Sequence, residues 1–188
     1  MGFEGYYLFM QRNLLNFRNP FRSNCIWKFR ALISLLNSIL ILQNPFIFAR
    51  TKLFLLRLQG AKIGKGIVLG KSVKVLYPWN LEIGDNCWIG EEVWFINHEK
   101  IKIGSNVCIS QRSIICSGGH DYRSASLEYA HKPIEIKDGA WVCLDAKVLP
   151  GATIGECSVV SAGEVARKSV PDYSMLVGGE IRPIDPPK

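Results

Sequence analysis

The chain has only three histidines, and its cysteines and histidines stand in no familiar metal-binding spacing. Its six cysteines form no Cys-x-x-Cys pair and no Cys/His cluster with zinc-ligand spacing, which argues against a metal site and predicts none. Without a cleavable signal, they are predicted to be free thiols in a reducing compartment, the cytoplasm. A disordered polymer is excluded, because 48% of the residues are hydrophobic and 11% are aromatic.

Acidic residues are missing from a long part of the chain, since none occurs between Glu4 and Glu82. The first 60 residues carry eight basic side chains and one acidic side chain, whereas the rest carries equal numbers of both signs. The net charge of +7 therefore belongs to the N-terminal segment. The rest lacks the positive stripe that nucleic acid binding requires, so we predict no nucleic acid partner. A basic, apolar segment suits an anionic membrane surface better.

A long, uninterrupted apolar helix is also missing. Residues 31–49 form a charge-free run of nineteen residues, but polar side chains and the pair Asn44-Pro45 interrupt it. The residue before a proline avoids the α region, so a helix is predicted to end there, and a second from about Phe46 to Leu58 would end at Gly60. Three interpretations of residues 1–60 stay open: a helical cap, attachment at the inner face of the plasma membrane, or a membrane span.

What the chain does contain is a six-residue repeat. An aliphatic or Phe side chain returns at every sixth position from Ile63 to Val160, with two interruptions of two residues and one of fifteen. The members of this series, called position i below, are Ile63, Leu69, Val75, Ile83, Ile89, Phe95, Ile103, Ile109, Ile115, Ile136, Val142, Val148, Ile154 and Val160. Short internal periods of this kind are typical of solenoids.

Three such hexads are predicted to make one triangular coil. Each flat side is a short strand with residue i pointing inward and a small residue at i+4 near the corner, and glycine is frequent at i+1. Stacked coils would pair their strands in parallel about 4.8 Å apart. Because no helix separates the strands, a βαβ array is excluded. The two-residue interruptions, Leu81-Glu82 and Ile101-Lys102, are predicted to lie at one corner.

The long interruption begins directly after His120. Residues 121–135 are in excess of the repeat and are predicted to leave the coil as a loop, and loops on rigid scaffolds are favoured places for catalysis. The small Gly118 and Gly119 would allow a ligand or partner to approach the backbone. Cys116 lies four residues upstream but has no feature that lowers a thiol pKa, so we interpret it as structural.

The hexads resemble the left-handed parallel β-helix of the hexapeptide acyltransferases. Three segments are similar to the colanic acid O-acetyltransferase subgroup: residues 77–86 (YPWNLEIGDN), Gly119-His120-Asp121-Tyr122, and Lys132-Pro133-Ile134. The resemblance covers residues 50 to 182. It implies an all-β, left-handed β-helix domain at 61–188 after a helical extension or cap at 1–60.

The resemblance also implies the chemistry. His120 would be a general base that takes the proton from an acceptor hydroxyl as the oxygen attacks acetyl-CoA, and imidazole suits this because its ordinary pKa is about 6.5. Asp121 could support the ring. The expected acceptor is a sugar hydroxyl in exopolysaccharide biosynthesis.

In the family, homotrimers hold CoA between neighbouring β-helices. By hexad alignment, the residues expected to bind CoA are Leu144, Ala162, Arg167, Lys168 and Arg182. Relatives usually carry Gly-Asn-Pro-Ala where this chain has Gly178-Gly179-Glu180-Ile181.

The acceptor side is expected to include Asn97 and His98, about one coil below His120. Trp141 matches a recurrent family tryptophan, for which contact with a ligand and packing against the loop are both open.

Three alternatives accompany this interpretation. A γ-class carbonic anhydrase has the same fold but needs three converging histidines, and His120 and His131 are expected in different structural settings. A non-catalytic trimeric scaffold is the second. The third keeps the chemistry but changes the acceptor to serine, an amino sugar or a chloramphenicol-like alcohol.

Overall fold

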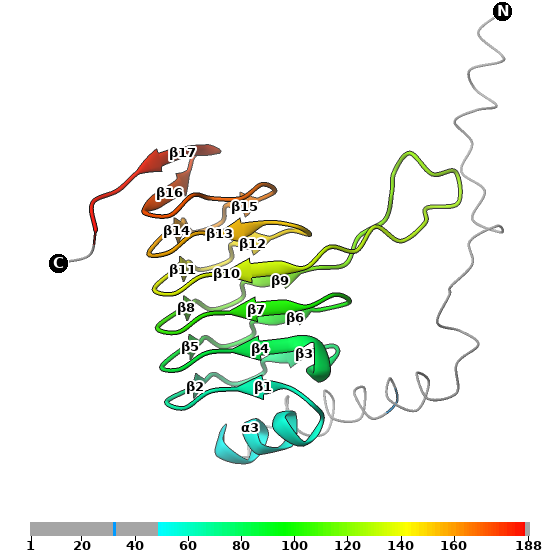
Figure 1. Cartoon of the computed structure of the whole chain (residues 1–188), viewed down its shortest axis with the longest axis vertical. Coiled ribbons are helices and arrows are strands. Elements are labelled where there is room, and N and C mark those ends of the chain that lie inside the picture. Colours follow the sequence, from blue (N-terminus) through cyan, green and yellow to red (C-terminus); the bar gives the residue numbers. More distant parts are fainter. Residues whose placement is uncertain (1–31, 33–48, 187–188) are drawn as a thin grey trace, which may run out of the picture.

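Short strands stacked in parallel build the domain, which is seen here in a computed structural model that describes residue 32 and residues 49–186 (Figure 1). Each of five coils contributes one strand to each of three sheets, here called A, B and C, and two further strands extend sheet B, the last of them antiparallel. Sheet A contains β1 (Lys62–Ile63), β4 (Leu81–Ile83), β7 (Ile101–Ile103), β10 (Ile134–Ile136) and β13 (Thr153–Ile154). Sheet B contains β2 (Val68–Leu69), β5 (Trp88–Ile89), β8 (Cys108–Ile109), β11 (Trp141–Val142), β14 (Val159–Val160), β16 (Ser174–Val177) and β17 (Glu180–Pro183). Sheet C contains β3 (Lys74–Val75), β6 (Trp94–Ile96), β9 (Ile114–Cys116), β12 (Lys147–Val148) and β15 (Val165–Ala166).

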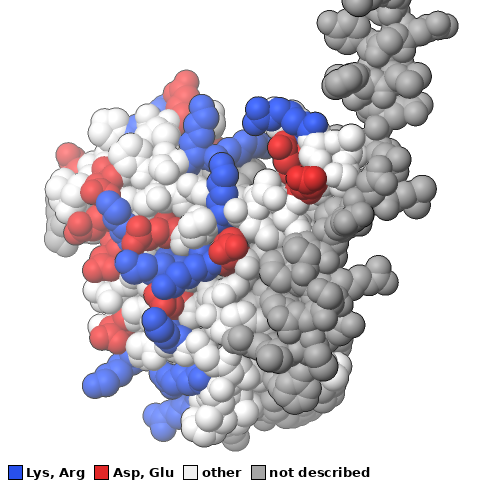
Figure 2. Space-filling model, turned by 45° about the vertical axis from the view of Figure 1, so that its right-hand side comes forward, with Lys and Arg blue, Asp and Glu red and all other residues white. Residues whose placement is uncertain are grey.

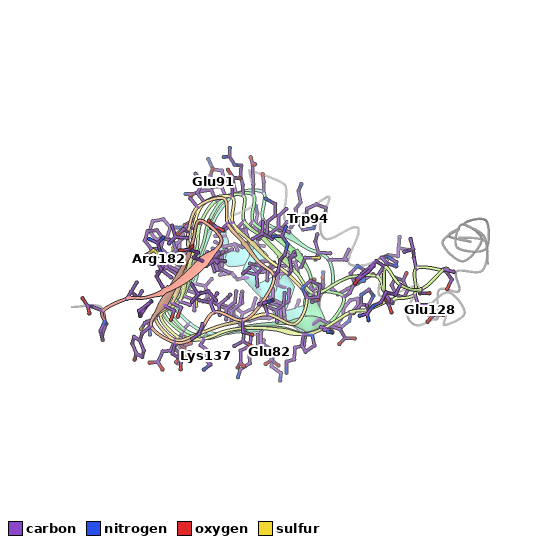
Figure 3. The ribbon with its side chains drawn as sticks, turned by 90° about the horizontal axis from the view of Figure 1, so that it is seen from above. Glu82, Glu91, Trp94, Glu128, Lys137 and Arg182 are labelled. Atoms are coloured by element: carbon purple, nitrogen blue, oxygen red, sulfur yellow. The ribbon has the colours of Figure 1, made fainter. Side chains whose placement is uncertain are left out.

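The coil is left-handed, as the family resemblance implies. Seen from above in Figure 3, the chain passes from Glu82 on sheet A past Glu91 to Trp94 on sheet C, which is a clockwise path. The same chain rises toward the viewer, because later coils lie higher in Figure 1. A clockwise path that approaches the viewer defines a left-handed coil.

The hexad series forms the core, which confirms the prediction. Twelve of its fourteen members are buried, and the other two, Ile63 and Leu69 in the first coil, are partly buried against the same cluster. The strands pair in register, for example Ile89 with Ile109 and Ile109 with Val142. The period of six therefore places one aliphatic side chain above another on each side of the triangle.

Two backbone positions explain why the coils stack so closely. A Cβ atom on Gly84, at i+1, would lie 2.6 Å from the backbone carbon of Gly104 in the next coil, so only glycine permits this approach. Position i+3 is the one in the left-handed region, with φ of 56° at Asn86 and 58° at Asn106. Asn is among the few residues that tolerate this conformation.

The two-residue interruptions do not lie at a corner, so that prediction is wrong. Leu81 and Ile101 are buried strand residues of β4 and β7, and Glu82 and Lys102 beside them face outward. In the first case the short 3₁₀ helix η3 (Pro78–Asn80) makes the corner instead. Each interruption therefore lengthens a strand by two residues, one apolar side chain that points inward and one charged side chain that points outward.

The helix α3 (Ala49–Leu58) covers the open end of the first coil (Figure 1). Its Leu56 joins the core cluster, and Arg57 donates hydrogen bonds to the carbonyls of Ile63 and Gly64 at 3.1 and 2.7 Å. Gly60 has φ of 96° and follows the helix, with Ala61 N–H donating to the Leu56 carbonyl at 3.0 Å, as in a Schellman motif. The described part of the extension is thus a cap that ends at Gly60 as predicted.

The question of membrane attachment falls mainly outside the described residues. The charge-free run 31–49 is described only at residues 32 and 49. Within residues 49–186, no helix is long and apolar enough to cross a membrane. The five cysteines of that range are free thiols, as predicted.

Candidate active site

The fifteen-residue excess forms a projecting hairpin at the corner between sheets C and A (Figures 1 and 3). It leaves after β9 and returns at β10, which already begins at Ile134, so the excursion ends two residues before the predicted Glu135. Its base is ordered by antiparallel backbone pairing between His120 and Tyr129. The Lys132 N–H also donates to the Ser117 carbonyl at 3.0 Å. His120 therefore lies on a fixed stem where the hairpin leaves the coil, with Glu128 beyond it toward the tip.

The His120 ring is oriented by a backbone carbonyl. Its Nδ1 lies 2.5 Å from the carbonyl oxygen of Leu127, across the hairpin. A carbonyl can only accept, so Nδ1 carries the hydrogen and the lone pair of the neutral ring is on Nε2. Asp121, the residue expected to support the ring, instead accepts from the N–H of Arg123 at 2.9 Å. The side chain of His120 is exposed, as a base for an external acceptor must be.

All three histidines of the chain belong to one cluster of rings, so the expectation of separate settings for His120 and His131 is wrong. His98 and His131 stack with centroids 4.6 Å apart and an interplanar angle of 21°. Tyr129 connects them to the catalytic candidate, at 4.5 Å from His131 and 5.1 Å from His120. Sequence spacing could not reveal this, because the hairpin brings residue 131 back beside residue 119.

The three histidine rings and Tyr129 pack against one another and do not converge on a common point. In the range 49–186, no group of three His, Cys, Asp or Glu side chains is placed to hold a metal ion. Burial lowers the pKa of His98, and the neighbouring His131 and His120 lower it further. Burial likewise lowers the pKa of His131, while the charge of Glu99 opposes this shift. Both partly buried rings therefore favour the neutral form at pH 7.

The glycines before His120 accommodate groups of the same chain. A Cβ on Gly118 would lie 2.5 Å from Cδ2 of His98, so the histidine ring occupies the space a side chain would need. The Gly119 N–H donates to Nδ1 of His131 at 3.0 Å. The groups that approach the backbone at these glycines are thus the chain's own rings of His98 and His131.

Asn97 is not available to an acceptor sugar, which corrects the prediction made for it. Its side chain is fully buried, accepts from the Tyr77 N–H at 2.9 Å and donates to the Tyr77 carbonyl at 2.5 Å. A buried amide can replace the missing backbone pairing at a widened corner. His98, the other acceptor-side prediction, does lie in the ring cluster beneath His120.

The thiol of Cys116 lies in the same coil and donates to the Gly118 carbonyl at 3.3 Å. Burial raises the pKa of this thiol. A raised pKa disfavours the nucleophilic thiolate, so the geometry supports the structural interpretation.

The residues predicted to bind CoA are spread over two corners and the last strand. Leu144 and Ala162 are exposed in successive coils at the corner between sheets B and C, where the Gly163 N–H donates to the Leu144 carbonyl at 2.9 Å. Arg167 and Lys168 follow β15 and line a hollow of about 250 Å³ that also includes Gly179. Arg182 lies on β17 and pairs with Glu180 at 3.0 Å.

Within one chain, these positions and His120 are not all in contact. Leu144 and Ala162 lie at one end of sheet C, and the hairpin with His120 leaves at its other end (Figure 3). Asp145, next to Leu144, is held by Arg112, whose Nε donates to it at 2.9 Å. The carboxylate at this corner is therefore neutralised by a cation in the coil below.

Trp141 is an exposed residue of β11 in sheet B. Sheet B is on the far side of the coil from the hairpin (Figure 3), so packing of Trp141 against its own loop is ruled out. Its side chain is 48% exposed, and its Nε1 donates to Ser110 at 2.9 Å. The outward residues in register with it form an apolar column. Its members are Val68, Trp88, Cys108, Trp141, Val159 and Met175.

Sheet A presents a charged face instead (Figure 2). Glu82 pairs with Lys62 and Lys100 at 2.7 and 2.8 Å, and Lys102 pairs with Glu135 at 2.8 Å. These side chains are partly or largely exposed, so they contribute little to stability but keep this face hydrated.

Comparison with known proteins supports the family assignment. No family model matches the chain. It is 43% identical over 128 residues to the protein named as colanic acid biosynthesis acetyltransferase WcaF in Escherichia coli K12, covering 68% of this chain and 70% of the relative. An acetyltransferase-like protein of Schizosaccharomyces pombe is 34% identical over 112 residues, covering 57% of this chain and 54% of the relative.

Solved structures share the fold. A maltose O-acetyltransferase of Clostridium difficile superposes with a TM-score of 0.80 at 23% identity, covering 92% of this chain and 96% of that one. A hexapeptide-repeat acetyltransferase of Vibrio cholerae, solved with acetyl coenzyme A, gives 0.77 at 23% identity, covering 85% and 88%. With the identity and coverage of the WcaF relative, the chain belongs to the hexapeptide-repeat acetyltransferases, in the group of the colanic acid biosynthesis acetyltransferases.

Proposed function

We propose that this acetyltransferase moves the acetyl group of acetyl-CoA to a sugar hydroxyl in exopolysaccharide biosynthesis, with His120 as the general base. The observation that carries the proposal is the bond from Nδ1 of His120 to the Leu127 carbonyl, which leaves the basic lone pair on Nε2. The name of the Escherichia coli relative supports an exopolysaccharide acceptor, and the acetyl coenzyme A complex of the Vibrio cholerae neighbour supports the donor.

The proposed reaction is a direct transfer. Nε2 of His120 takes the proton of the acceptor hydroxyl while its oxygen bonds to the thioester carbonyl carbon. The carbon–sulfur bond then breaks, and the departing CoA sulfur receives the proton from the imidazolium. The Leu127 carbonyl stabilises the imidazolium because it accepts from Nδ1 in both protonation states. No thiol of the protein takes part, in keeping with the protonated, partly buried Cys116.

The decisive variant is His120→Ala, with Asp121→Asn as its matched control. Loss of a general base is expected to lower kcat about 10²- to 10⁴-fold. Asp121 does not contact the ring, and an asparagine oxygen can still accept from the Arg123 N–H, so the control should keep its activity. Release of CoA thiol would be followed with sugar nucleotides and lipid-linked oligosaccharides as acceptors. Near wild-type turnover by the alanine variant would refute the mechanism.

We further propose that the working unit is a homotrimer. Leu144 and Ala162 of one chain are separated from its own His120 by the width of sheet C, so CoA at that corner would meet His120 of another chain. The exposed apolar column on sheet B, with Trp88 57% exposed and Trp141 in register two strands above it, suits contact with further copies of this chain.

A shared site can be tested by complementation. His120→Ala and Ala162→Trp should each be inactive alone, since one lacks the base and the other blocks the proposed CoA path. Refolding the two variants together should restore activity, because a mixed trimer contains sites with both intact halves. Light scattering should give three times the 21.1 kDa mass of the chain. An active monomer, or no recovery in folded mixed trimers, would exclude the shared site.

Peripheral membrane attachment through residues 1–60 is part of the same proposal. Its support is the net charge of that segment, eight basic residues against one acidic residue. The full chain should sediment with vesicles that contain anionic phosphatidylglycerol and not with neutral phosphatidylcholine vesicles. Equal recovery in both supernatants would remove this element without affecting the chemistry.

A further inference from the structure

Both polar groups of the residue before His120 are held by the returning strand of the hairpin. The Gly119 N–H donates to Nδ1 of His131 at 3.0 Å, and the Gly119 carbonyl accepts from the Ala130 N–H at 2.9 Å. Gly119 and His120 share a peptide bond, so these contacts set where the His120 backbone lies. The bond to His131 is the only one of the two that depends on a side chain.

This contact requires the neutral form of His131. Its Nδ1 accepts a hydrogen bond, so the ring hydrogen of the neutral form is on Nε2. Nε2 is buried and has no hydrogen-bond partner among the described residues. A protonated ring would carry a hydrogen on Nδ1 as well, directed at the Gly119 N–H, and two donors cannot bond to each other.

The surroundings of His131 favour this neutral form. Its ring stacks on His98 and contacts Tyr129, and His120 lies close enough to oppose a second positive charge. Glu99 and the backbone of Gly119 act in the opposite direction and favour protonation. Burial is the largest influence and lowers the pKa of His131, so the ring remains an acceptor at neutral pH.

We propose that His131 is a positioning residue for His120: its neutral ring holds the Gly119 amide and so fixes the peptide that carries the base, and protonation of His131 releases it. The inference rests on the proposed role of His120. It assigns to His131 no contact with the substrate.

Two substitutions separate the hydrogen bond from the packing. His131→Phe keeps a flat ring against His98 but removes the acceptor. His131→Asn places an amide oxygen near the position of Nδ1 and can accept from the Gly119 N–H. A displacement of about 1 Å can lower a rate about 100-fold, so kcat of the Phe variant should fall by about that factor with little change in KM for acetyl-CoA. The Asn variant should recover most of this loss.

The pH profile supplies a second readout. When protonation of one group abolishes activity, the acid limb of log kcat has a slope of about one, and when two groups must both be neutral the slope approaches two. The slope should approach two in the wild-type enzyme and return to about one in His131→Asn. A purely structural role for His131 would not change this slope.

A measurement on the wild-type protein does not depend on any variant folding. Nuclear magnetic resonance can follow hydrogen exchange of the Gly119 amide together with the ring nitrogen shifts of His131 as the pH is lowered. Protection of the amide should fall in step with protonation of His131. Protection that stays constant through that titration would overturn the inference, as would wild-type kcat in His131→Phe when His120→Ala is inactive. If His120→Ala itself stays active, the proposed function fails, whereas the amide measurement still reports on His131.

Discussion

Replacing Gly118 with alanine should damage catalysis more than folding. The added Cβ would lie 2.5 Å from Cδ2 of His98, whereas carbon atoms in ordinary contact are about 3.5–4.0 Å apart. The ring must therefore move by about 1 Å, and it stacks on His131, which holds the Gly119 amide. A 1 Å displacement near a reacting group is enough to lower a rate about 100-fold. Overpacking of this kind reduces the free energy of unfolding by about 1–3 kcal/mol.

The assay compares kcat with chemical denaturation for Gly118→Ala alone and in a His98→Ala background. Removing the ring removes the clash, so adding Gly118→Ala to His98→Ala should lower kcat far less than adding it to the wild type. The double-mutant cycle isolates this contact. An equal effect of the glycine substitution in both backgrounds, or a Gly118→Ala enzyme with wild-type kcat, would refute the reasoning.

Three further predictions concern stability and the chemical mechanism. The pKa values of His98 and His131 are lowered mainly by burial, so the unfolded chain takes up protons below about pH 6.5 that the folded chain does not. The contribution of these neutral histidines to the free energy of unfolding should thus be fully present above that pH and should be lost as the pH is lowered toward their folded-state pKa values. Urea denaturation should therefore give a smaller free energy of unfolding at about pH 5.5 than at about pH 7.5. Ile109→Ala, at a fully buried core position, should cost about 2–5 kcal/mol by the same method. Cys116→Ser should leave kcat unchanged, because burial raises the pKa of that thiol; a large loss of kcat would point to an acyl-cysteine intermediate.

The fold could be predicted from the sequence because one physical requirement repeats along it. Every sixth side chain must fill the same narrow column, so the period is visible in the sequence at residues such as Ile89 and Ile109, which are both fully buried. The interruptions were less predictable. Leu81 and Ile101 are apolar and strand-forming, and only the stacking of whole coils shows that they extend a strand rather than turn a corner.

The site could be predicted in part. The break in the repeat points to His120 as the candidate base, but nothing in the spacing indicates the group that orients its ring, because that group is the backbone carbonyl of Leu127. Asn97, predicted to bind the acceptor, is instead buried in a corner, where it bonds to the Tyr77 backbone. The sequence does not distinguish these cases, because a polar side chain in a solenoid can either face solvent or bond to backbone groups that lack a partner. The repeat marks His131 only as a member of the loop, yet a signal for it does exist: it lies directly before Lys132-Pro133-Ile134, where the chain rejoins the coil.

Contacts with the neighbouring coils fix the position of the base of the hairpin. A fifteen-residue insertion would ordinarily be among the more mobile parts of a protein, yet the residues at the base of this hairpin are held by the scaffold. Gly118 contacts the ring of His98 in the coil below, and the returning His131 stacks on that same ring while it binds the Gly119 amide. The stacking distance between coils therefore sets the position of His120. Under the proposed function, we expect that insertions toward the tip, beyond the pairing of His120 with Tyr129, leave the position of His120 unchanged.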